Sequence, residues 1–295
     1  VQVWDRQAQR LIDVPEVGGG AIRFTYGTVP GRLLAKAFLC RRPVSALYAA
    51  WQRSRLSRGK VRRFMQAYHI SADDCTAQEF SCFNDFFTRK RRAEALHIDM
   101  EPTHLISPCD SLLSAYRITP ESRFEIKHCA YSLESLLRDR PLAERYAGGL
   151  CLIFRLTPRH YHRYCYIDDG RRGDSFPLDG VLHSVRPMCI GSMPVFVENQ
   201  REYTVMDTTR FGRVTQVEVG ALMVGKICNT PGQGRIRRGE EKGHFAFGGS
   251  TIILLLEPGR VQLNSEIFRR TARGQELPVR QGQQIGTAHD EEDMP

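Results

Sequence analysis

Residues 245–256 read Phe-Ala-Phe-Gly-Gly-Ser-Thr-Ile-Ile-Leu-Leu-Leu, and the interpretation of the whole chain depends on them. The second half, residues 251–256, is a short apolar run that predicts a strand. Gly248 and Gly249 stand directly before Ser250, so the backbone can bend sharply where that strand begins. Because Gly249 has no Cβ to screen its carbonyl, a neighbouring hydroxyl can approach it. On the residues alone, the plainer interpretation is a glycine-rich turn in which Ser250 merely caps the strand.

From about residue 105 onward the chain consists of short apolar runs separated by turn residues. Three further runs predict strands: residues 150–156, 214–219 and 221–227. Gly239 and Gly243 bracket the charged triplet Glu240-Glu241-Lys242, which predicts a turn or loop before a strand. The segment after Gln275 is mostly polar, and we expect it to be poorly ordered at its acidic end.

The positive charge is concentrated near the N-terminus. The net charge is +9, yet residues 17–72 hold 11 of the 42 Lys and Arg residues and no Asp or Glu. The other 31 basic residues nearly balance the 33 acidic ones. One segment therefore carries the excess charge.

This basic segment has the periodicity of amphipathic helices. Pro43 stands where a helix can begin, and apolar residues follow at i, i+3, i+4 and i+7. They are Val44, Leu47, Tyr48 and Trp51, then Val61, Phe64, Met65 and Tyr68, with a shorter set of Leu34, Ala37 and Phe38. Such faces suit an anionic lipid surface, at about 1 kcal/mol per cation. A helical layer with a solvated basic rim fits the composition equally well, whereas nucleic acid is disfavoured because no recognised motif for it is present.

The polar residues 71–76 are interpreted as a linker after the basic segment. Thr76 and Glu79 then have the spacing of a capping box, which predicts a helix through Phe80 and on to Phe87. The sequence therefore predicts an α+β fold, with basic amphipathic helices followed by a strand-rich, mainly antiparallel body. We expect two domains, residues 1–75 and residues 76–295.

The composition excludes several classes of protein. With 295 residues, 41% of them hydrophobic, the chain can bury a core without disulfides. No apolar run approaches the ~18 residues of a membrane-spanning helix, and no secretory leader is expected. The first residue is not Met, so further residues can precede it. The nine scattered cysteines include no C-x-x-C pair, so we expect mostly reduced core thiols in a cytosolic compartment.

His160-Tyr-His162, with Cys165 close behind, is a weak metal-site pattern. On a strand, two histidines at this spacing point to one face. A further ligand would have to come from elsewhere, such as His183, and spacing this short is common by chance. We therefore expect no metal.

Several motifs together resemble those of the phosphatidylserine decarboxylase family. Phe247-Gly248-Gly249-Ser250-Thr251, preceded by residues 239–245, is similar to the family's self-cleavage region. Other segments agree in order and spacing: Phe83-Asn-Asp-Phe-Phe-Thr-Arg89, Ser107-Pro-Cys-Asp110, Arg155-Leu-Thr-Pro158 through Tyr161-His162-Arg163, Leu182-His-Ser-Val-Arg-Pro187, Asn199-Gln-Arg-Glu202, Phe211-Gly212 through Val219-Gly-Ala221, and Val224-Gly225. The match runs from roughly residue 80 to 260, and the chain before it agrees only in being helical and basic.

The resemblance implies an enzyme that makes its own cofactor. The Ser250 hydroxyl would attack the Gly249 carbonyl and convert the peptide bond into an ester. β-Elimination would then cleave the chain between residues 249 and 250 and leave a dehydroalanine that hydrolyses to a pyruvoyl group. That group would form a Schiff base with the amine of phosphatidylserine and take up the electrons left when carbon dioxide departs. The product would be phosphatidylethanolamine.

The family activates the serine through an Asp-His-Ser relay, and Asp110 and Ser250 match two of its positions. The third position departs from the family, whose Tyr-His-Arg-x-His reads Tyr161-His162-Arg163-Tyr164-Cys165 here. A thiol, with an ordinary pKa of about 8.5, is a poor base at neutral pH unless a nearby cation lowers that pKa.

The base for self-cleavage therefore stays open between Cys165, His162, His160 and His183. We rank His162 first, because it matches the histidine that the family retains and associates with decarboxylation itself.

A lipid substrate gives the basic segment a use, because the enzyme must dock on a bilayer. Our candidate membrane contacts are Arg41, Arg42, Trp51, Arg62 and Arg63. The implied partners are phosphatidylserine, an anionic membrane surface and the chain's own two cleavage products, with a homodimer left open and no nucleic acid. The implied location is peripheral, on the cytoplasmic face of a membrane.

Two alternatives stay open. A pyruvoyl decarboxylase of a soluble amino acid would have the same motifs, but it would not need an acid-free basic segment. An unprocessed homologue that binds lipid without catalysis is suggested by Cys165 in place of the relay histidine.

Overall fold

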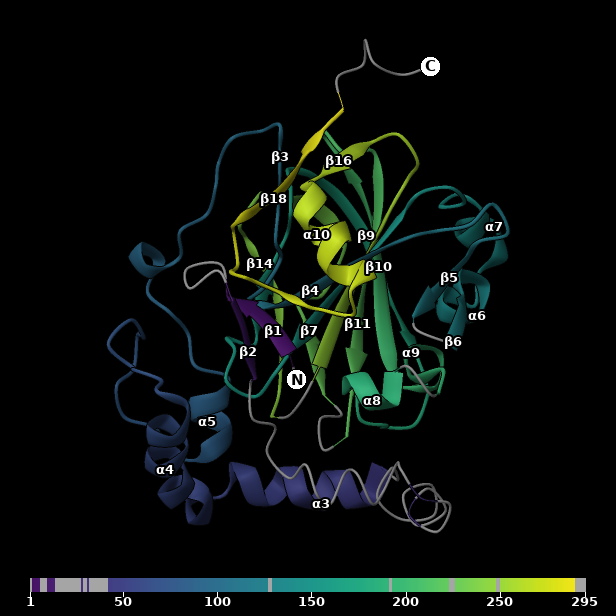
Figure 1. Cartoon of the computed structure of the whole chain (residues 1–295). Coiled ribbons are helices and arrows are strands. Elements are labelled where there is room, and N and C mark those ends of the chain that lie inside the picture. The colour runs from purple at the N-terminus through teal and green to yellow at the C-terminus, as the bar shows by residue number, and fades with distance from the viewer. Residues whose placement is uncertain are drawn as a thin grey trace.

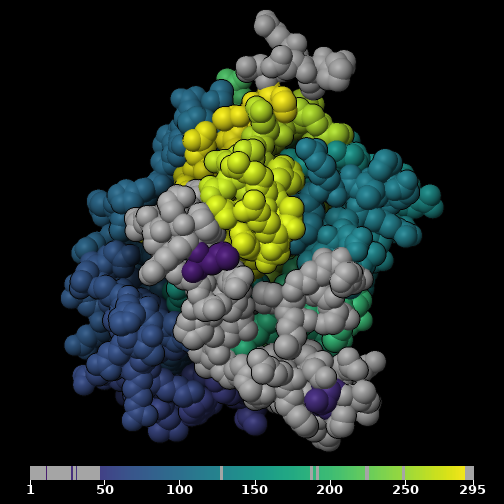
Figure 2. All heavy atoms as spheres, in the orientation of Figure 1, coloured from purple at the N-terminus to yellow at the C-terminus, as the bar shows by residue number. Residues whose placement is uncertain are grey.

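The computed structural model describes residues 2–5, 10–13, 28, 31, 42–126, 129–190, 193–222, 226–247 and 250–289. It confirms the α+β class, since helices come first and mostly antiparallel strands follow. Figure 1 shows the helices α3, α4 and α5 gathered at one end of the strands. Figure 2 shows the same face filled with side chains, with the yellow C-terminal segment at its centre and the blue helical segment below it on the left.

The helices are short apart from those of the basic segment. The α-helices are α3 (Arg42–Arg53), α4 (Arg58–Tyr68), α5 (Phe83–Phe87), α6 (Leu133–Leu137), α7 (Arg140–Glu144), α8 (Pro187–Ile190), α9 (Val195–Glu198) and α10 (Ser265–Ala272), and the 3₁₀ helices are η2 (Arg55–Ser57) and η3 (Ala93–Ala95). No helix among the described residues is long and apolar enough to cross a bilayer.

One eight-stranded antiparallel sheet dominates the body. In spatial order its strands are β13 (Gly234–Ile236), β9 (Gly170–Leu178), β10 (Arg201–Thr208), β11 (Arg213–Gly220), β15 (Ser250–Leu256), β7 (Leu150–Leu156), β4 (Ser111–Arg117) and β17 (Leu277–Val279).

Smaller sheets accompany it. One three-stranded sheet consists of β12 (Ile227–Asn229), β14 (Glu241–Phe245) and β8 (Arg163–Cys165). A second consists of β16 (Val261–Leu263), β18 (Gln284–Ala288) and β3 (His104–Ile106). Two are hairpins, β1 (Gln2–Asp5) with β2 (Arg10–Asp13), and β5 (Arg123–Ile126) with β6 (Cys129–Ser132).

The strand predicted at residues 251–256 is the middle of the large sheet. β15 lies between β11 and β7, and all seven of its residues are buried. Ile252 and Leu254 face one core, whereas Ile253 and Leu255 face the other. Because both faces are covered, this strand is a continuous apolar run rather than an alternating one.

The large sheet is thus the middle of three layers. On one side it packs against the two three-stranded sheets and against α10 through Ile267. On the other side it is covered by α6, α7, α8, α9 and the β5–β6 hairpin. The predicted strands 150–156 and 214–219 are β7 and β11, which flank β15.

The helical predictions for the basic segment are confirmed where the structure describes it. α3 and α4 cover the two predicted repeats, and the shorter set at residues 34–38 lies outside the described residues. A third core joins the segment to the body, because Val61 of α4 packs with Phe83, Phe86 and Phe87 of α5. The Phe83 amide also donates to Ser57 Oγ over 2.8 Å.

Two local predictions were wrong. The expected helix from Thr76 contains only Phe83–Phe87, because the Thr76 amide and hydroxyl both donate to the Lys90 carbonyl instead of capping a helix. The expected strand at 221–227 does not form: Ala221 is only a single bridge residue, Leu222 is in a turn, and β12 begins at Ile227. The segment after Gln275, for which no strand was predicted, forms β17 and β18, which pair with β4 and β3. Its acidic end, which was expected to be poorly ordered, lies outside the described residues.

The predicted turn around the charged triplet is shorter than expected. Gly239 has φ +76°, but β14 already begins at Glu241, so Gly243 lies within a strand. A Cβ on Gly243 would come within 2.5 Å of the Cys228 carbonyl oxygen of β12, so only glycine allows the two strands to approach this closely.

Candidate active site

Ser250 is the first residue of the central strand. It pairs with Gly220 of β11 on one side and with Leu156 of β7 on the other, and it is fully buried. Its Oγ has no hydrogen-bond partner among the described residues. A buried hydroxyl without a partner costs about 1–3 kcal/mol, so structural serines are rarely left this way. The position is therefore suited to a reacting group. Gly249 lies outside the described residues.

The segment before Ser250 is held by aromatic rings. The Phe247 ring lies 5.0 Å from Phe83 and 5.0 Å from Phe87, measured between centroids, and 5.8 Å from Tyr48 of α3. The Phe247 amide donates to Asn84 Oδ1 over 3.2 Å. The basic helices and the segment that leads to Ser250 are consequently one packed unit.

His162 lies in the same aromatic cluster. It is fully buried, and its ring lies 3.9 Å from the ring of Phe87. Its Nδ1 is 2.9 Å from the His160 carbonyl oxygen, which can only accept, so Nδ1 carries the proton in this contact. The neutral ring then has its lone pair on Nε2, which is the arrangement of a general base. The His162 carbonyl accepts from the Phe245 amide at 3.0 Å, which ties the histidine to β14.

His160 has a different environment. The Thr157 amide donates to its Nδ1 over 3.0 Å. Burial, and then the positive charge of Arg159, hold the pKa of His160 well below its usual range. Both histidines precede β8 rather than lying on a strand, so the premise of the H-x-H metal pattern was wrong. The described residues contain no cluster of three or more His, Cys, Asp or Glu arranged for a metal.

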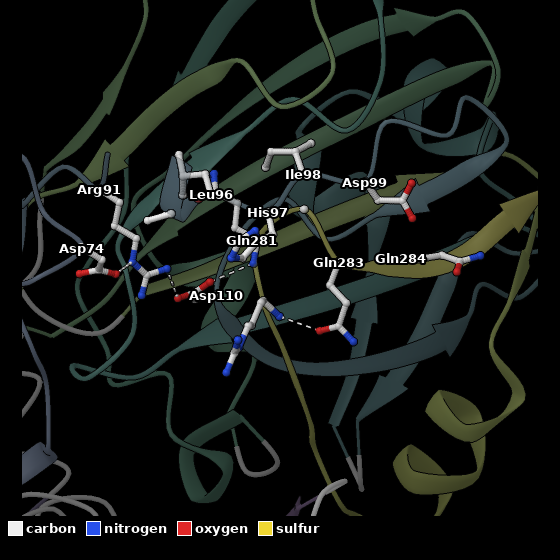
Figure 3. A pocket seen from close by; sticks show the side chains of 13 residues that line it. Asp74, Arg91, Leu96, His97, Ile98, Asp99, Asp110, Gln281, Gln283 and Gln284 are labelled. Atoms are coloured by element: carbon white, nitrogen blue, oxygen red, sulfur yellow. Dashed lines mark hydrogen bonds and ion pairs between the residues drawn. The ribbon is translucent and has the colours of Figure 1, made fainter. Parts of the chain in front are cut away.

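Asp110 stands immediately before β4 and is held from two directions. Arg91 Nη1 donates to Asp110 Oδ2 over 2.9 Å, and the backbone amide of Gln281 donates to Asp110 Oδ1 over 2.9 Å. Arg91 also forms an ion pair with Asp74, 2.8 Å apart. Figure 3 shows this chain of charges, with Arg91 between the two carboxylates and Asp110 reaching toward Gln281. Asp110 is therefore an anchored carboxylate.

Cys165, at the end of β8, lies close to Asp110. Its amide donates to the Pro108 carbonyl over 2.9 Å, and its thiol lies beside the side chain of Gln281. Burial raises the pKa of the Cys165 thiol to about 12. The hypothesis that a cation lowers this pKa is contradicted, because desolvation is the larger effect. The thiol stays protonated at neutral pH and cannot serve as a base there.

His183 lies beside the strand partner of Ser250. The Asn199 amide group donates to the His183 carbonyl over 2.9 Å and to the Gly220 carbonyl over 2.7 Å. His183 Nε2 is itself 3.1 Å from a carboxylate oxygen of Glu198. This histidine therefore already has an anionic partner.

A buried ion pair that the sequence did not predict lies next to the Ser250 end of the sheet. Lys242 Nζ is 2.8 Å from Glu218 Oε1, and neither side chain is exposed. Glu218 pairs with Ile252, so it is a diagonal neighbour of Ser250 across the strand pair. Gln216 and Asn229 complete the hydrogen bonds of the Glu218 carboxylate.

The candidate membrane contacts lie on the basic helices. Arg62 and Arg63 are exposed on α4, and Arg42 is the first residue of α3, whereas Arg41 lies outside the described residues. Trp51 is 39% exposed, and the Lys60 ammonium lies 3.6 Å from the centroid of its ring. Leu47 and Leu56 are 76% and 83% exposed, so two large aliphatic side chains are open to solvent on the same basic segment as these arginines.

Sequence reasoning missed the groups that hold the site residues. Arg91 and Gln281, which anchor Asp110, follow no recognisable pattern, and Gln281 lies in a polar segment for which no strand was predicted. Asn84 lies inside the aromatic motif of residues 83–89, which was the available signal for its contact with Phe247.

Comparisons with known proteins find the following similarities. The profile of the phosphatidylserine decarboxylase family matches residues 83–287. The chain is 38% identical to phosphatidylserine decarboxylase proenzyme 2 of Clostridium acetobutylicum over 290 residues, which covers 98% of this chain and 99% of the relative. It is 37% identical over 297 residues to the phosphatidylserine decarboxylase proenzyme of Ruminiclostridium cellulolyticum, with 98% of each chain covered. The proenzyme of Clostridium perfringens is 36% identical over 292 residues, with 97% and 99% covered.

The environment of Cys165 predicts its reactivity. Because the thiolate is the nucleophile, a fully buried thiol with a pKa of about 12 should stay unmodified by iodoacetamide at pH 8. Peptide mapping by mass spectrometry should find Cys165 labelled only after unfolding, whereas the half-buried Cys129 is labelled earlier. Labelling of native Cys165 at the rate of Cys129 would contradict the assigned protonation state.

Proposed function

The chain belongs to the phosphatidylserine decarboxylase family of carboxy-lyases, and on this basis we propose that it converts phosphatidylserine to phosphatidylethanolamine with a pyruvoyl group made from its own Ser250. The observation that carries the proposal is the buried Ser250 hydroxyl, which has no hydrogen-bond partner among the described residues at the first position of the central strand. The relatives are named proenzymes, which agrees with a chain that is processed before it acts.

The processing uses only groups of this chain and water. Ser250 Oγ attacks the Gly249 carbonyl carbon, the peptide C–N bond breaks, and the hydroxyl proton passes through a base to the released Ser250 amine. Loss of the Cα proton of Ser250 then expels the Gly249 carboxylate, which leaves a C=C bond between Cα and Cβ of residue 250. Water replaces the nitrogen, ammonia departs, and residue 250 becomes a ketone. The second chain comprises residues 250–295.

The surroundings of residue 250 fit such a group. It lies at the end of a fully buried strand, between Gly220 and Leu156, so the flanking strands would hold it in place and keep bulk water away. A pyruvoyl group supplies a carbonyl that binds the substrate amine and accepts the electrons released on decarboxylation.

We propose that His162 is the base that removes the hydroxyl proton of Ser250 and then its Cα proton. Its Nδ1 faces the His160 carbonyl, which leaves Nε2 to accept a proton, and it shares Phe87 with the segment before Ser250. Cys165 does not fit the role, because its thiol pKa is raised to about 12. Asp110, paired with Arg91, acts as a positioning residue that anchors the β4 end of the site.

We propose that residues 1–75 dock the enzyme on an anionic membrane, so that residues 76–295 can act on lipid headgroups from the cytoplasmic side. The exposed Leu47, Trp51 and Leu56 would enter the lipid interface while neighbouring arginines bind its anions. The eight free thiols of the described residues agree with a reducing compartment. Because Tyr48 of α3 contacts Phe247, docking would occur directly beside the cleavage segment.

Ser250→Ala should abolish processing, because alanine has no nucleophile. On a denaturing gel the parent protein should show a fragment of about 5 kDa, and the variant should show only the intact chain of 33.6 kDa. Thr251→Val is the matched control, since it removes the neighbouring buried hydroxyl that also has no partner among the described residues. Parent protein that stays intact while decarboxylating phosphatidylserine would refute the proposed cofactor, and intact, inactive protein would favour the lipid-binding alternative.

His162→Gln should slow the appearance of the small fragment about 100-fold, because general base catalysis contributes at least that factor. Cys165→Ser should change the rate less than 3-fold, since the protonated thiol takes no proton. A quench-flow or gel time course on freshly refolded chain measures both. If Cys165→Ser slows self-cleavage more than His162→Gln does, the base lies at position 165. Cys165→His would then speed self-cleavage.

Neutralising Arg41, Arg42, Arg62 and Arg63 to Gln should weaken flotation with anionic liposomes about 100-fold or more, because each cation near the surface contributes roughly 1 kcal/mol. The control removes four exposed arginines of the body: Arg171, Arg210, Arg235 and Arg237. Equal losses in both variants would mean that net charge alone drives the binding, and unchanged flotation would exclude the proposed electrostatic docking.

A further inference from the structure

A cavity of about 770 Å³ lies where the basic helices meet the body. Tyr68 and His69, at the end of α4, line it on one side. Ser111, Arg159 and Arg280 line it on the other. The cavity is thus bordered both by the segment proposed to dock on the membrane and by the strands of the catalytic body.

The charges around this cavity favour an anion. Four arginines and three aspartates line it, and one arginine, Arg91, already spans two of the aspartates, Asp74 and Asp110. The neighbouring cavity in Figure 3, of about 1030 Å³, has the opposite balance, with Asp74, Asp99 and Asp110 against Arg91 and Arg280. Of these two cavities, the first has spare positive charge and the second does not.

Arg159 carries much of that spare charge. It is half-buried, and among the described residues no carboxylate pairs with its guanidinium. Its strongest charged neighbour is Arg155, another cation, and burial lowers the pKa of Arg159. A partly buried charge without a counter-ion is costly, so a bound anion would stabilise this arrangement.

Arg89 is a second, independent sign of a ligand. The residue is only 4% exposed and lines the cavity. Among the described residues, its side chain makes one hydrogen bond, a long one of 3.4 Å from Nη1 to the Phe86 carbonyl. A guanidinium has five N–H donors, so most of those of Arg89 remain available to an anion.

The register of the large sheet relates this cavity to Ser250. Leu112 of β4 lies opposite Arg155 of β7, and Arg155 lies opposite Thr251 of β15. Ser111 precedes Leu112 on β4, and Ser250 precedes Thr251 on β15. Ser111 and Ser250 therefore lie at the same end and on the same face of the sheet, with β7 between their strands. Adjacent strands are about 4.8 Å apart, so the two positions are separated by ~10 Å, which a lipid headgroup and an arginine side chain can span together.

We propose that this cavity is a phosphodiester subsite, in which Arg159, with Arg89 and Arg280, binds the phosphate of the lipid headgroup while its serine end reaches residue 250. The proposal rests on the function proposed above. It assigns the recognition of the phosphate to residues outside the self-cleavage motif. Arg280 is exposed at the rim, where it can meet an incoming headgroup.

Binding can be tested without activity, on the uncleaved Ser250→Ala chain. Glycerophosphoethanolamine, which carries the phosphodiester but no carboxylate, should raise the Tm by about 3 °C at ten times its Kd. Adding Arg159→Gln or Arg280→Gln should remove most of this rise, and Arg159→Lys should retain part of it. Arg235→Gln, an exposed arginine on the opposite edge strand β13, is the matched control and should leave the rise intact.

Two other probes identify the source of the anion. Free serine should have no effect, and stabilisation by serine but not by glycerophosphoethanolamine would overturn the proposal in favour of a carboxylate site. Stabilisation by inorganic phosphate alone would likewise overturn it, because the site would then bind the free ion rather than a headgroup.

Kinetics separate this proposal from the proposed function. In neutral detergent micelles, which remove docking to an anionic surface, Arg159→Gln should raise the KM for phosphatidylserine about 10-fold and change kcat less than 2-fold, the size expected for one charged hydrogen bond. Normal self-cleavage on the gel shows that the variant is folded. If the parent protein is active and the KM is unchanged in both Arg159→Gln and Arg280→Gln, the phosphodiester subsite is refuted but the decarboxylase function is not. If the parent protein is inactive, the proposed decarboxylase function itself is refuted.

Discussion

The burial of the central strand β15 on both faces and both edges constrains the whole active site. Seven consecutive residues from Ser250 to Leu256 pair with β11 and β7 and contribute to two cores. A shift of one residue in this register would exchange every side chain between the two cores, so the position of Ser250 is fixed as firmly as the fold itself. The Ser250 hydroxyl is held at the start of the strand because the apolar run that follows it is fixed in the sheet.

That constraint also explains how the basic helices belong to the site. The chain that enters β15 must cross the end of the sheet, and Phe247 does so between rings from α3 and α5. At the same end, Arg91 connects Asp74, within the polar segment 71–76, with Asp110, which immediately precedes β4. The segment proposed to meet the membrane is thus packed against the segment proposed to be cleaved.

The failed capping prediction at Thr76 and the unpredicted strands after Gln275 have a common physical cause. Thr76 has a good capping sequence, but its amide and hydroxyl have a partner at Lys90, fourteen residues away. The polar segment after Gln275 becomes ordered because β4 and β3 offer it edges to pair with, and that pairing brings the Gln281 amide to Asp110. In each case a contact distant in the sequence outweighed a local preference, which pattern reasoning cannot detect.

The sequence by itself determined the α+β class, the apolar strands at 150–156, 214–219 and 251–256, the basic helices, and the motif that marks Ser250, because periodicity, charge and residue order are local properties. Only the tertiary structure decided what surrounds those residues: the Arg91 and Gln281 contacts of Asp110, the buried Lys242–Glu218 pair, and the protonated state of Cys165. Charge and proton affinity depend on desolvation and on neighbours from remote parts of the chain, so they become defined only when the chain is packed.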